Sequence, residues 1–188
     1  DAPVYTNIKY IIPINPPHVP IENKTAYYRK YFDIPATWRG RRFVICFNGV
    51  DSSFYFWFNG IFIGFSSDSR LPAEFDLTEH IRDRGNTVEV LVLRFSAGHY
   101  LEDQDMWNLS GMFRDVNIYS LPRPIHIFDF NWRAYLSTEN PLQPSTATLK
   151  VKVSLSWCSQ RLLRIVRDGD LHFGSMKKSW MLRLELFK

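Results

Sequence analysis

An Asn-Gly pair between two runs of aromatic and aliphatic residues constrains the fold of this chain more than any other feature. Residues 54–58 precede Asn59-Gly60, and residues 61–65 follow it. Asn and Gly tolerate the positive φ angles at both centres of a type I′ turn, so the segment predicts a β-hairpin. Because both faces of the hairpin are apolar, we expect a central, covered pair of strands rather than a sheet edge. The side chains expected in its core are Phe54, Phe56, Trp57 and Phe58.

Further short runs rich in aromatic or β-branched residues occur at fairly regular spacing, as is typical of strands. The expected strands span residues 26–32, 43–47, 53–58, 61–65, 88–95 and 116–119. One short helical turn is expected at 76–81, where Asp76 and Glu79 match a capping box. Many short strands with little helix predict an all-β fold, with a jelly-roll β-sandwich over residues 1–121.

A second segment begins at residues 122–124, where two prolines mark a boundary. Residues 125–136 form an expected strand, and residues 147–157 alternate strictly between apolar and polar side chains, which predicts a half-buried strand. The two strands suggest the start of an immunoglobulin-like β-sandwich, which needs about 100 residues. Residues 122–157 therefore predict an incomplete one, followed by an unassigned basic tail at 158–188.

Composition and charge argue against several classes of protein. The apolar share of 45% is enough for a packed core, and the net charge of +4 arises entirely within residues 158–188. A basic nucleic-acid face on the main domain is therefore not indicated. There is no run of about 18 apolar residues, so no membrane span is expected. No segment resembles a signal peptide, which favours a cytoplasmic location, and the initial Asp suggests a fragment or a processed chain.

The densest polar cluster lies at residues 100–107, with the sequence Tyr-Leu-Glu-Asp-Gln-Asp-Met-Trp. Three carboxylates within four residues repel one another, so a cation, an arginine or a hydroxyl-rich ligand is expected nearby. With the ring of Trp107 beside them, the carboxylates suit a carbohydrate. The alternative is a solvated acidic loop paired with Arg70 or Arg114. A catalytic pair is not expected, because neighbouring carboxylates on one loop seldom hold the two different environments that a glycosidase needs.

Several longer motifs occur in a fixed order along the first 121 residues. They are Tyr5-Thr6-Asn7, Asn15-Pro16-Pro17, Asp68-Ser69-Arg70-Leu71-Pro72, residues 100–107, and Phe113-Arg114-Asp115-Val116. Together they resemble the bacterial lacZ-type β-galactosidases of glycoside hydrolase family 2. The acidic motif at 100–107 points to the β-galactosidase branch rather than to the glucuronidases or mannosidases. The resemblance fades through 122–157, and we find none after Trp157.

The resemblance implies a jelly roll that leans on a catalytic (β/α)₈ barrel and forms one wall of the galactose pocket. It implies that Asn7 hydrogen-bonds galactose hydroxyls, and that Asp105 binds sugar hydroxyls and ligates a sodium ion. Magnesium would belong to the complete enzyme. No segment here resembles the parts of the barrel that carry the two catalytic glutamates, so we expect no hydrolysis by this chain alone. Arg70 and Arg114 are expected to hold loops.

Three functions remain open from the sequence. The first is the non-catalytic sugar-binding portion of a β-galactosidase, an enzyme that hydrolyses terminal β-D-galactosides; its partners would be a galactoside and the catalytic barrel. The second is a stand-alone carbohydrate-binding module. The third is a structural or interaction fragment, in which the half-built second sandwich offers an open sheet edge to another chain.

Overall fold

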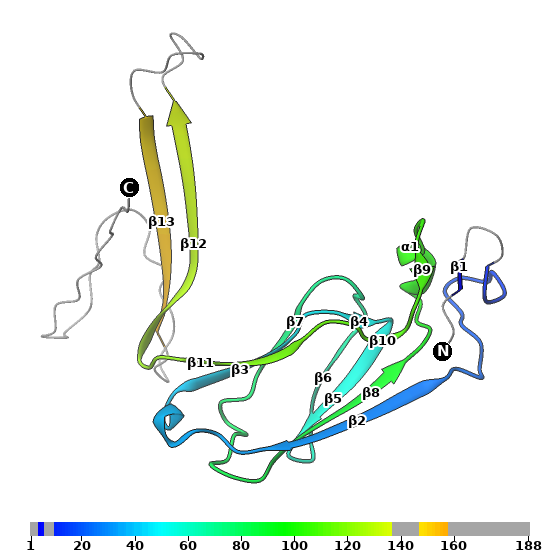
Figure 1. Ribbon diagram of the computed structural model, residues 1–188, viewed down its shortest axis with the longest axis horizontal. Coiled ribbons are helices and arrows are strands. Elements are labelled where there is room, and N and C mark those ends of the chain that lie inside the picture. Colours follow the sequence, from blue (N-terminus) through cyan, green and yellow to red (C-terminus); the bar gives the residue numbers. More distant parts are fainter. Residues whose placement is uncertain (1–3, 6–9, 137–146, 158–188) are drawn as a thin grey trace, which may run out of the picture. The chain divides into compact units, whose positions relative to one another are not determined.

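The computed structural model of the chain describes residues 4–5, 10–136 and 147–157 (Figure 1). The chain divides between Ile127 and Phe128 into two units, which are considered separately. The strands of the first unit are β1 (Val4–Tyr5), β2 (Thr25–Phe32), β3 (Arg42–Phe47), β4 (Val50–Asp51), β5 (Ser53–Phe58), β6 (Ile61–Ser66), β7 (Ala73–Asp76), β8 (Asn86–Leu93), β9 (Trp107–Asn108), β10 (Gly111–Met112) and β11 (Val116–Leu121). Its helices are a 3₁₀ turn, η1 (Ala36–Trp38), and a single α-helical turn, α1 (His99–Glu102). None of the described helices is long and apolar enough to cross a membrane.

Two antiparallel sheets form the body of the first unit. One has the strand order β2-β8-β5-β6, and the other has the order β11-β3-β7. Two short pairs, β10-β4 and β1-β9, lie outside these sheets. The all-β fold expected from the sequence is confirmed, and all six strands expected in this unit lie within two residues of their predicted ends. Strand β8 begins and ends two residues earlier than expected.

The core lies between the two sheets and is largely aromatic. The Phe47 ring of β3 packs against Phe54 and Phe56 of β5, with ring centroids 4.8 and 5.1 Å apart. Alternate residues of a strand point to one face, and this places Phe54, Phe56 and Phe58 in the core, where they are at most 1% exposed. Each such side chain contributes roughly 1.5–3 kcal/mol of hydrophobic stabilisation.

The turn between β5 and β6 confirms the predicted hairpin, because Asn59 and Gly60 have φ angles of 51° and 80°. The expectation of a covered pair was right for β5 and wrong for β6. Within the described residues β6 is the last strand of its sheet, with Phe62 54% and Phe65 47% exposed. Trp57 lies on this outer face rather than in the core, with its ring centroid 5.5 Å from that of Phe62. Apolar content alone does not reveal which face another layer covers.

The segment expected as a helical turn differs from the prediction in one respect. Asp76 ends β7 and accepts a hydrogen bond from the N–H of Thr78 at 2.9 Å, as a cap does. One backbone turn follows, in which the N–H groups of His80 and Ile81 both donate to the carbonyl of Leu77. The carboxylate of Glu79 lies 4.0 Å from Arg123, so the reciprocal half of the capping box is replaced by a long ion pair at the surface.

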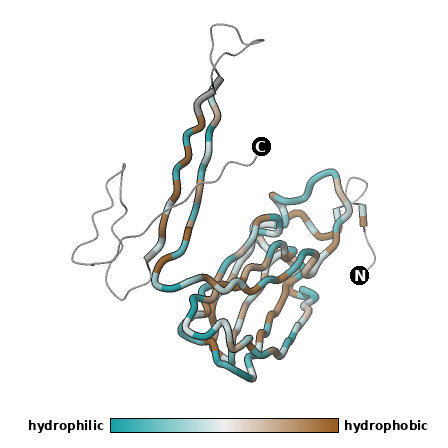
Figure 2. The backbone as a smooth tube through the Cα atoms, turned by 60° about the vertical axis from the view of Figure 1, so that its left-hand side comes forward, coloured by the Kyte–Doolittle hydropathy of each residue, from teal (hydrophilic) through white to brown (hydrophobic). Residues whose placement is uncertain are grey.

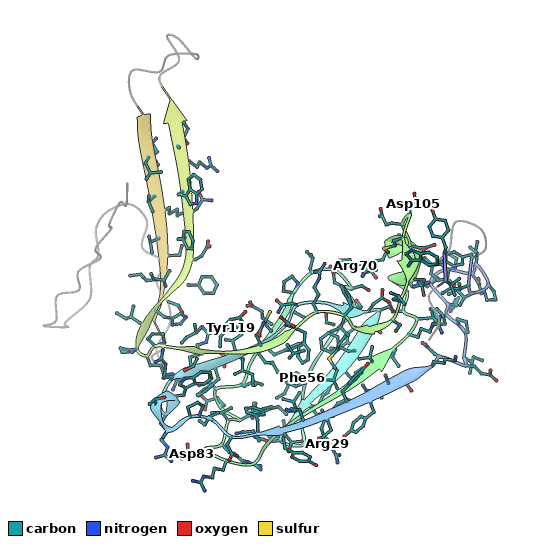
Figure 3. The ribbon with its side chains drawn as sticks, viewed as in Figure 1. Arg29, Phe56, Arg70, Asp83, Asp105 and Tyr119 are labelled. Carbon is teal, nitrogen blue, oxygen red and sulfur yellow. The ribbon has the colours of Figure 1, made fainter. Side chains whose placement is uncertain are left out.

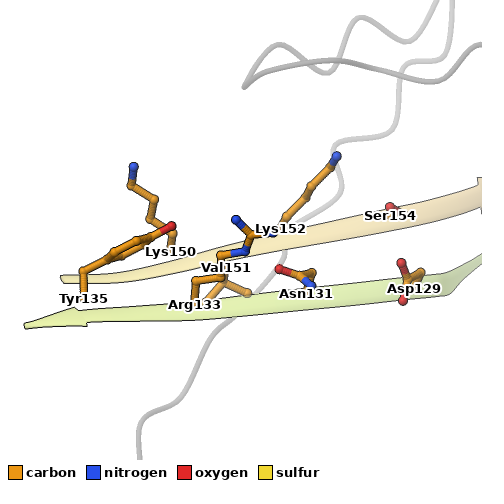
Figure 4. Close-up of a pocket in the computed structure, with 8 residues that line it drawn as sticks. All are labelled: Asp129, Asn131, Arg133, Tyr135, Lys150, Val151, Lys152 and Ser154. Carbon is orange, nitrogen blue, oxygen red and sulfur yellow. The ribbon is translucent and has the colours of Figure 1, made fainter.

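Strands β12 (Ile125–Leu136), which belongs to the second unit from Phe128 onward, and β13 (Ala147–Trp157) form a two-stranded sheet, and their limits match the two predicted strands. Hydropathy alternates along both strands (Figure 2). One face carries Phe128, Phe130 and Trp132, which are 63–70% exposed. The other face is polar and bears a shallow depression of about 480 Å³ (Figure 4), lined by Asp129, Asn131, Arg133, Tyr135, Lys150, Val151, Lys152 and Ser154. The immunoglobulin-like sandwich and the boundary after residue 121 stay predictions.

Candidate functional site

The acidic motif at 100–107 runs from the helical turn α1 to the short strand β9, at one end of the first unit. Figure 3 shows Asp105 there, far from Asp83 at the opposite end. Strand β9 is positioned by β1, with Tyr5 opposite Trp107 and Val4 opposite Asn108. The hydroxyl of Tyr5 donates a hydrogen bond to the carboxylate of Asp105. The chain near its N-terminus is therefore joined to the motif by both backbone and side chain.

An exposed aromatic ring lies beside this carboxylate. Trp107 is 59% exposed, and its ring centroid is 5.5 Å from that of Tyr5. Asp105 is exposed as well. A carboxylate can accept strong, charge-assisted hydrogen bonds from hydroxyl groups, and an indole ring offers an apolar surface with a polar edge. Such a surface suits a ligand that presents hydroxyls on its rim and C–H groups on its face.

Glu102 joins the acidic motif to the loop at 68–72. Its carboxylate accepts a hydrogen bond from the N–H of Ser69 at 2.9 Å and a second one from the Ser69 hydroxyl. Asp68 accepts hydrogen bonds from the N–H groups of Arg70 and Leu71, both at 3.0 Å, and these bonds lower the pKa of its carboxyl group. Glu102 is thus directed inward at Ser69, whereas Asp105 is held by Tyr5, so the two carboxylates occupy different surroundings.

An ion pair with one buried partner holds the same loop. Arg70 Nη2 lies 3.2 Å from Asp51 Oδ2, and the Asp51 side chain is 7% exposed. Burial raises the pKa of Asp51 to about 6, although the charge of Arg70 opposes this shift. The same Arg70 nitrogen contacts the sulfur of Met106, inside the acidic motif, at 3.4 Å. Arg70 therefore connects the core of the sandwich to the motif, which agrees with a role in holding loops.

Arg114 also holds backbone in place, but through carbonyl groups. Its Nη1 donates to the carbonyl of Arg70 at 2.7 Å and to that of Asn48 at 3.1 Å. Both guanidinium groups lie over the ring of Phe113, at 4.9 Å for Arg70 and 5.0 Å for Arg114. Such cation–π contacts add modest stability at exposed sites. Arg70 and Arg114 thus share the ring of Phe113 as a common contact, and together they hold the backbone of the loop at 68–72.

Tyr100 fixes the proline-rich segment next to the motif. Its hydroxyl donates to the carbonyl of His18 at 2.6 Å and also lies 3.0 Å from that of Pro13. The ring of Tyr10 stacks on Tyr100 with centroids 6.0 Å apart. The contacts of Tyr5 and Tyr100 were not predicted from the sequence. Their one sequence signal is that both belong to motifs used for the family resemblance.

The two residues expected to contact the ligand have different outcomes. Asp105 is exposed beside Trp107, which is compatible with the expected role but does not test it. Asn7 lies in 6–9, outside the described residues. Hard cations take oxygen ligands, and the carboxylate of Asp105 can supply one of them to a sodium ion. Across 4–5, 10–136 and 147–157, however, no three Asp, Glu, His or Cys side chains gather to hold a metal ion. The sodium site therefore stays a prediction, for which the described residues offer the carboxylate of Asp105.

The fold and this surface define a β-sandwich module that presents carboxylate and aromatic groups at one end. The family model described as "Glycosyl hydrolases family 2, sugar binding domain" matches residues 1–122, and the chain belongs to this family.

Relatives among known proteins agree with this assignment. The chain is 52% identical to a β-galactosidase of Yersinia pestis bv. Antiqua (strain Angola), in an alignment that covers 100% of the chain and 17% of that protein. A β-galactosidase of Yersinia pseudotuberculosis (serotype O:1b, strain IP 31758) is also 52% identical, and 16% of its length is covered. The chain thus spans about a sixth of the length of these relatives. Both alignments continue through 158–188, so the expectation that the resemblance ends at Trp157 is wrong.

Solved structures share the fold. A β-glycosidase from Bacteroides vulgatus matches 73% of the chain and 17% of its own, with a TM-score of 0.58 and 24% identity. A β-glucuronidase from Bifidobacterium dentium, solved with coumarin-3-O-glucuronide, matches 71% of the chain and 27% of its own, with a TM-score of 0.60 and 18% identity. At these identities the likeness shows the sandwich and does not distinguish the sugar.

Proposed function

We propose that this chain is the non-catalytic sugar-binding portion of a β-galactosidase and that its acidic motif shapes the galactose subsite. The whole enzyme would hydrolyse terminal β-D-galactosides on a catalytic barrel outside these 188 residues. The family assignment and the 52% identity to the Yersinia β-galactosidases support this reading. The proposal assigns no hydrolysis to residues 1–188 alone.

One observation carries the proposal: an exposed carboxylate is held beside an exposed indole ring, at a distance from the sandwich core. Asp105 is oriented by the Tyr5 hydroxyl, and Trp107 is held by the β1–β9 pair. Binding sites for small polar ligands depend on a few well-placed polar groups next to apolar surface. Asp105 would accept hydrogen bonds from galactose hydroxyls, while Trp107 would cover the C–H face of the sugar.

Two further groups complete the proposed subsite. Asn7, two residues after Tyr5, would donate and accept hydrogen bonds with the sugar. Asp105 would also ligate a sodium ion, whose charge offsets that of the carboxylate and polarises bound hydroxyls. The other sodium ligands would come from water, backbone oxygens or the remainder of the enzyme.

Calorimetric titration with galactose tests the proposal. A single wall of a pocket should bind no tighter than about millimolar, worth roughly −4 kcal/mol. We expect saturable binding that Asp105→Asn abolishes and that Asp83→Asn, a matched change at the opposite end of the unit, leaves unchanged. Equal binding by the wild type and Asp105→Asn would refute the proposed subsite.

A chromogenic galactoside separates the proposal from its alternatives. No hydrolysis is expected from the purified chain, and measurable turnover would contradict the non-catalytic assignment. Affinity in the micromolar range would instead favour a stand-alone carbohydrate-binding module, because such a module needs no second wall. Absence of any sugar binding, with self-association of the chain, would favour the structural fragment.

A further inference from the structure

An apolar groove opens on one side of the sandwich, between the edges of its two sheets. Its volume is about 550 Å³. The floor consists of Ile45, Phe47 and Val90, which belong to the core and are each 1% exposed. The walls include Phe32, Trp38, Met112, Val116 and Ile118. The groove therefore reaches from the surface to the residues that hold the sandwich together.

Both long rims of this groove are strand edges. Strand β2 is the last strand of the four-stranded sheet, and β11 is the last strand of the three-stranded one. Within the part of the chain that the structure describes, β2 pairs with β8 alone and β11 with β3 alone. An edge strand presents a row of backbone N–H and C=O groups that can pair with another extended chain.

The combination of apolar walls and open backbone edges favours a strand over other occupants. A small apolar ligand would fill the walls but would leave the edge N–H and C=O groups unpaired. A β-strand satisfies both, because alternate side chains point to one face while its backbone pairs with the rim. Folded soluble domains rarely expose a large apolar surface, and where they do, that surface usually binds another molecule.

The length of the relatives indicates where such a strand would come from. The aligned region is 17% of the Yersinia pestis relative, so most of a protein of that kind lies outside it. A segment of the same polypeptide docks at high effective concentration, with no need for a high intrinsic affinity. The groove also contains Lys30 on its β2 rim, a cation that an acidic or hydroxyl side chain of the incoming strand can pair with.

We infer that this groove receives a β-strand from a part of the enzyme polypeptide outside residues 1–188. The strand pairs with the free edge of β2, which has eight residues against six in β11 and so offers the longer ladder. Its alternate apolar side chains insert between Ile118 on one sheet and Val90 on the other, closing the sandwich.

Overlapping synthetic peptides test the inference on the 188-residue chain. They cover the Yersinia pestis relative outside the aligned region and are about twelve residues long, which exceeds a typical strand. Fluorescence anisotropy should find a peptide with alternating apolar residues that binds, and hydrogen exchange should show slower exchange of β2 amides when it is bound. Ile118→Lys places a charge in the groove and should weaken binding at least about tenfold, a loss of 1.4 kcal/mol. Tyr119→Lys, on the opposite face of β11 and 45% exposed, is the matched control and should leave binding unchanged.

Three results would overturn the inference. One is that no peptide binds, and another is that a peptide binds but protects amides away from β2. The third is concentration-dependent dimerisation of the chain that Ile118→Lys abolishes and Tyr119→Lys does not, because a second copy would then fill the groove. If Ile118→Lys does not fold, the exchange experiment on the unchanged chain still decides among these outcomes.

Discussion

The hydroxyl of Tyr5 donates a hydrogen bond to the carboxylate of Asp105, although 100 positions separate them in the sequence. Tyr5 is held opposite Trp107 by the pairing of β1 with β9. One tyrosine thus orients the acidic side chain and packs against the neighbouring indole. The proposed sugar surface is therefore built from two distant segments, and its geometry depends on both.

Removing the Tyr5 hydroxyl should weaken the sugar site without unfolding the domain. Tyr5→Phe keeps the ring against Trp107 and deletes the donor to Asp105. We expect galactose affinity to fall about three- to tenfold, while the free energy of unfolding changes by no more than about 0.5 kcal/mol, because the half-buried ring keeps its packing and only the hydroxyl is lost. Calorimetric titration and urea denaturation measure the two effects. Tyr119→Phe, on an exposed strand face elsewhere, serves as the control, and equal affinities of Tyr5→Phe and wild type would argue against this role.

The proposed sodium ion gives a second prediction. Replacing sodium chloride by choline chloride at the same ionic strength removes the small cation but keeps the screening of surface charges. Galactose affinity of the wild-type chain should fall several-fold in choline. Any residual binding by Asp105→Asn should be insensitive to the exchange, because that variant lacks the carboxylate ligand. Identical titrations of the wild type in both salts would eliminate sodium from the subsite.

The buried carboxyl of Asp51 predicts a pH dependence of stability. Its pKa is raised to about 6 by burial, and the folded state therefore binds this proton more tightly than the unfolded state does. The resulting stabilisation is complete below about pH 4, the unfolded pKa, and is lost as the pH rises through about 6. Relative to Asp51→Asn, the wild type should lose about 2–3 kcal/mol of stability between about pH 4 and pH 7.

Denaturation curves at a series of pH values check this loss. Asp83→Asn is the control, since the Asp83 side chain is 57% exposed in its pair with Arg39. Parallel pH profiles for the wild type and Asp51→Asn would mean that Asp51 is not the titrating group.

Two adjacent aromatic residues of β5 should differ sharply in their contribution to stability. Phe56 is fully buried between the sheets, whereas Tyr55 is 37% exposed on the outer face. Phe56→Ala should cost about 3–5 kcal/mol, because it leaves a cavity in the core. Tyr55→Ala should cost about 1 kcal/mol or less. Chemical denaturation of both variants measures this contrast, and similar losses would show that the two faces of β5 are equally covered.

Local patterns predicted much of this fold. The Asn59-Gly60 turn, the aromatic alternation of β5 and the polar–apolar alternation of β13 each specify their structure through nearby residues. The position of β6 at a sheet edge was not predictable, because the periodicity of a strand does not say what covers its faces. Strands β1 and β9, two of the four strands that have only two residues, show no recognisable sequence pattern and form because segments distant in the sequence pair with each other.

The candidate site, like the fold, was predictable only in part. Composition and family resemblance identified the acidic motif and Asp105. The bonds of Tyr5 to Asp105 and of Glu102 to Ser69 depend on tertiary contacts between loops, for which neither spacing nor composition gives a sign. The ion pair of Arg70 with buried Asp51 was missed for the same reason, since Asp51 belongs to a two-residue strand without a recognisable pattern.

Residue-resolved NMR of the ¹⁵N-labelled chain during a galactose titration tests the central claim most directly. The account predicts saturable shifts of the amides of Tyr5, Gln104, Asp105 and Trp107, which fit one millimolar-range constant and vanish in Asp105→Asn. The amides of the β5–β6 hairpin should not move. Shifts confined to that hairpin, or none at galactose concentrations well above about 10 mM, would contradict a sugar surface at the acidic motif.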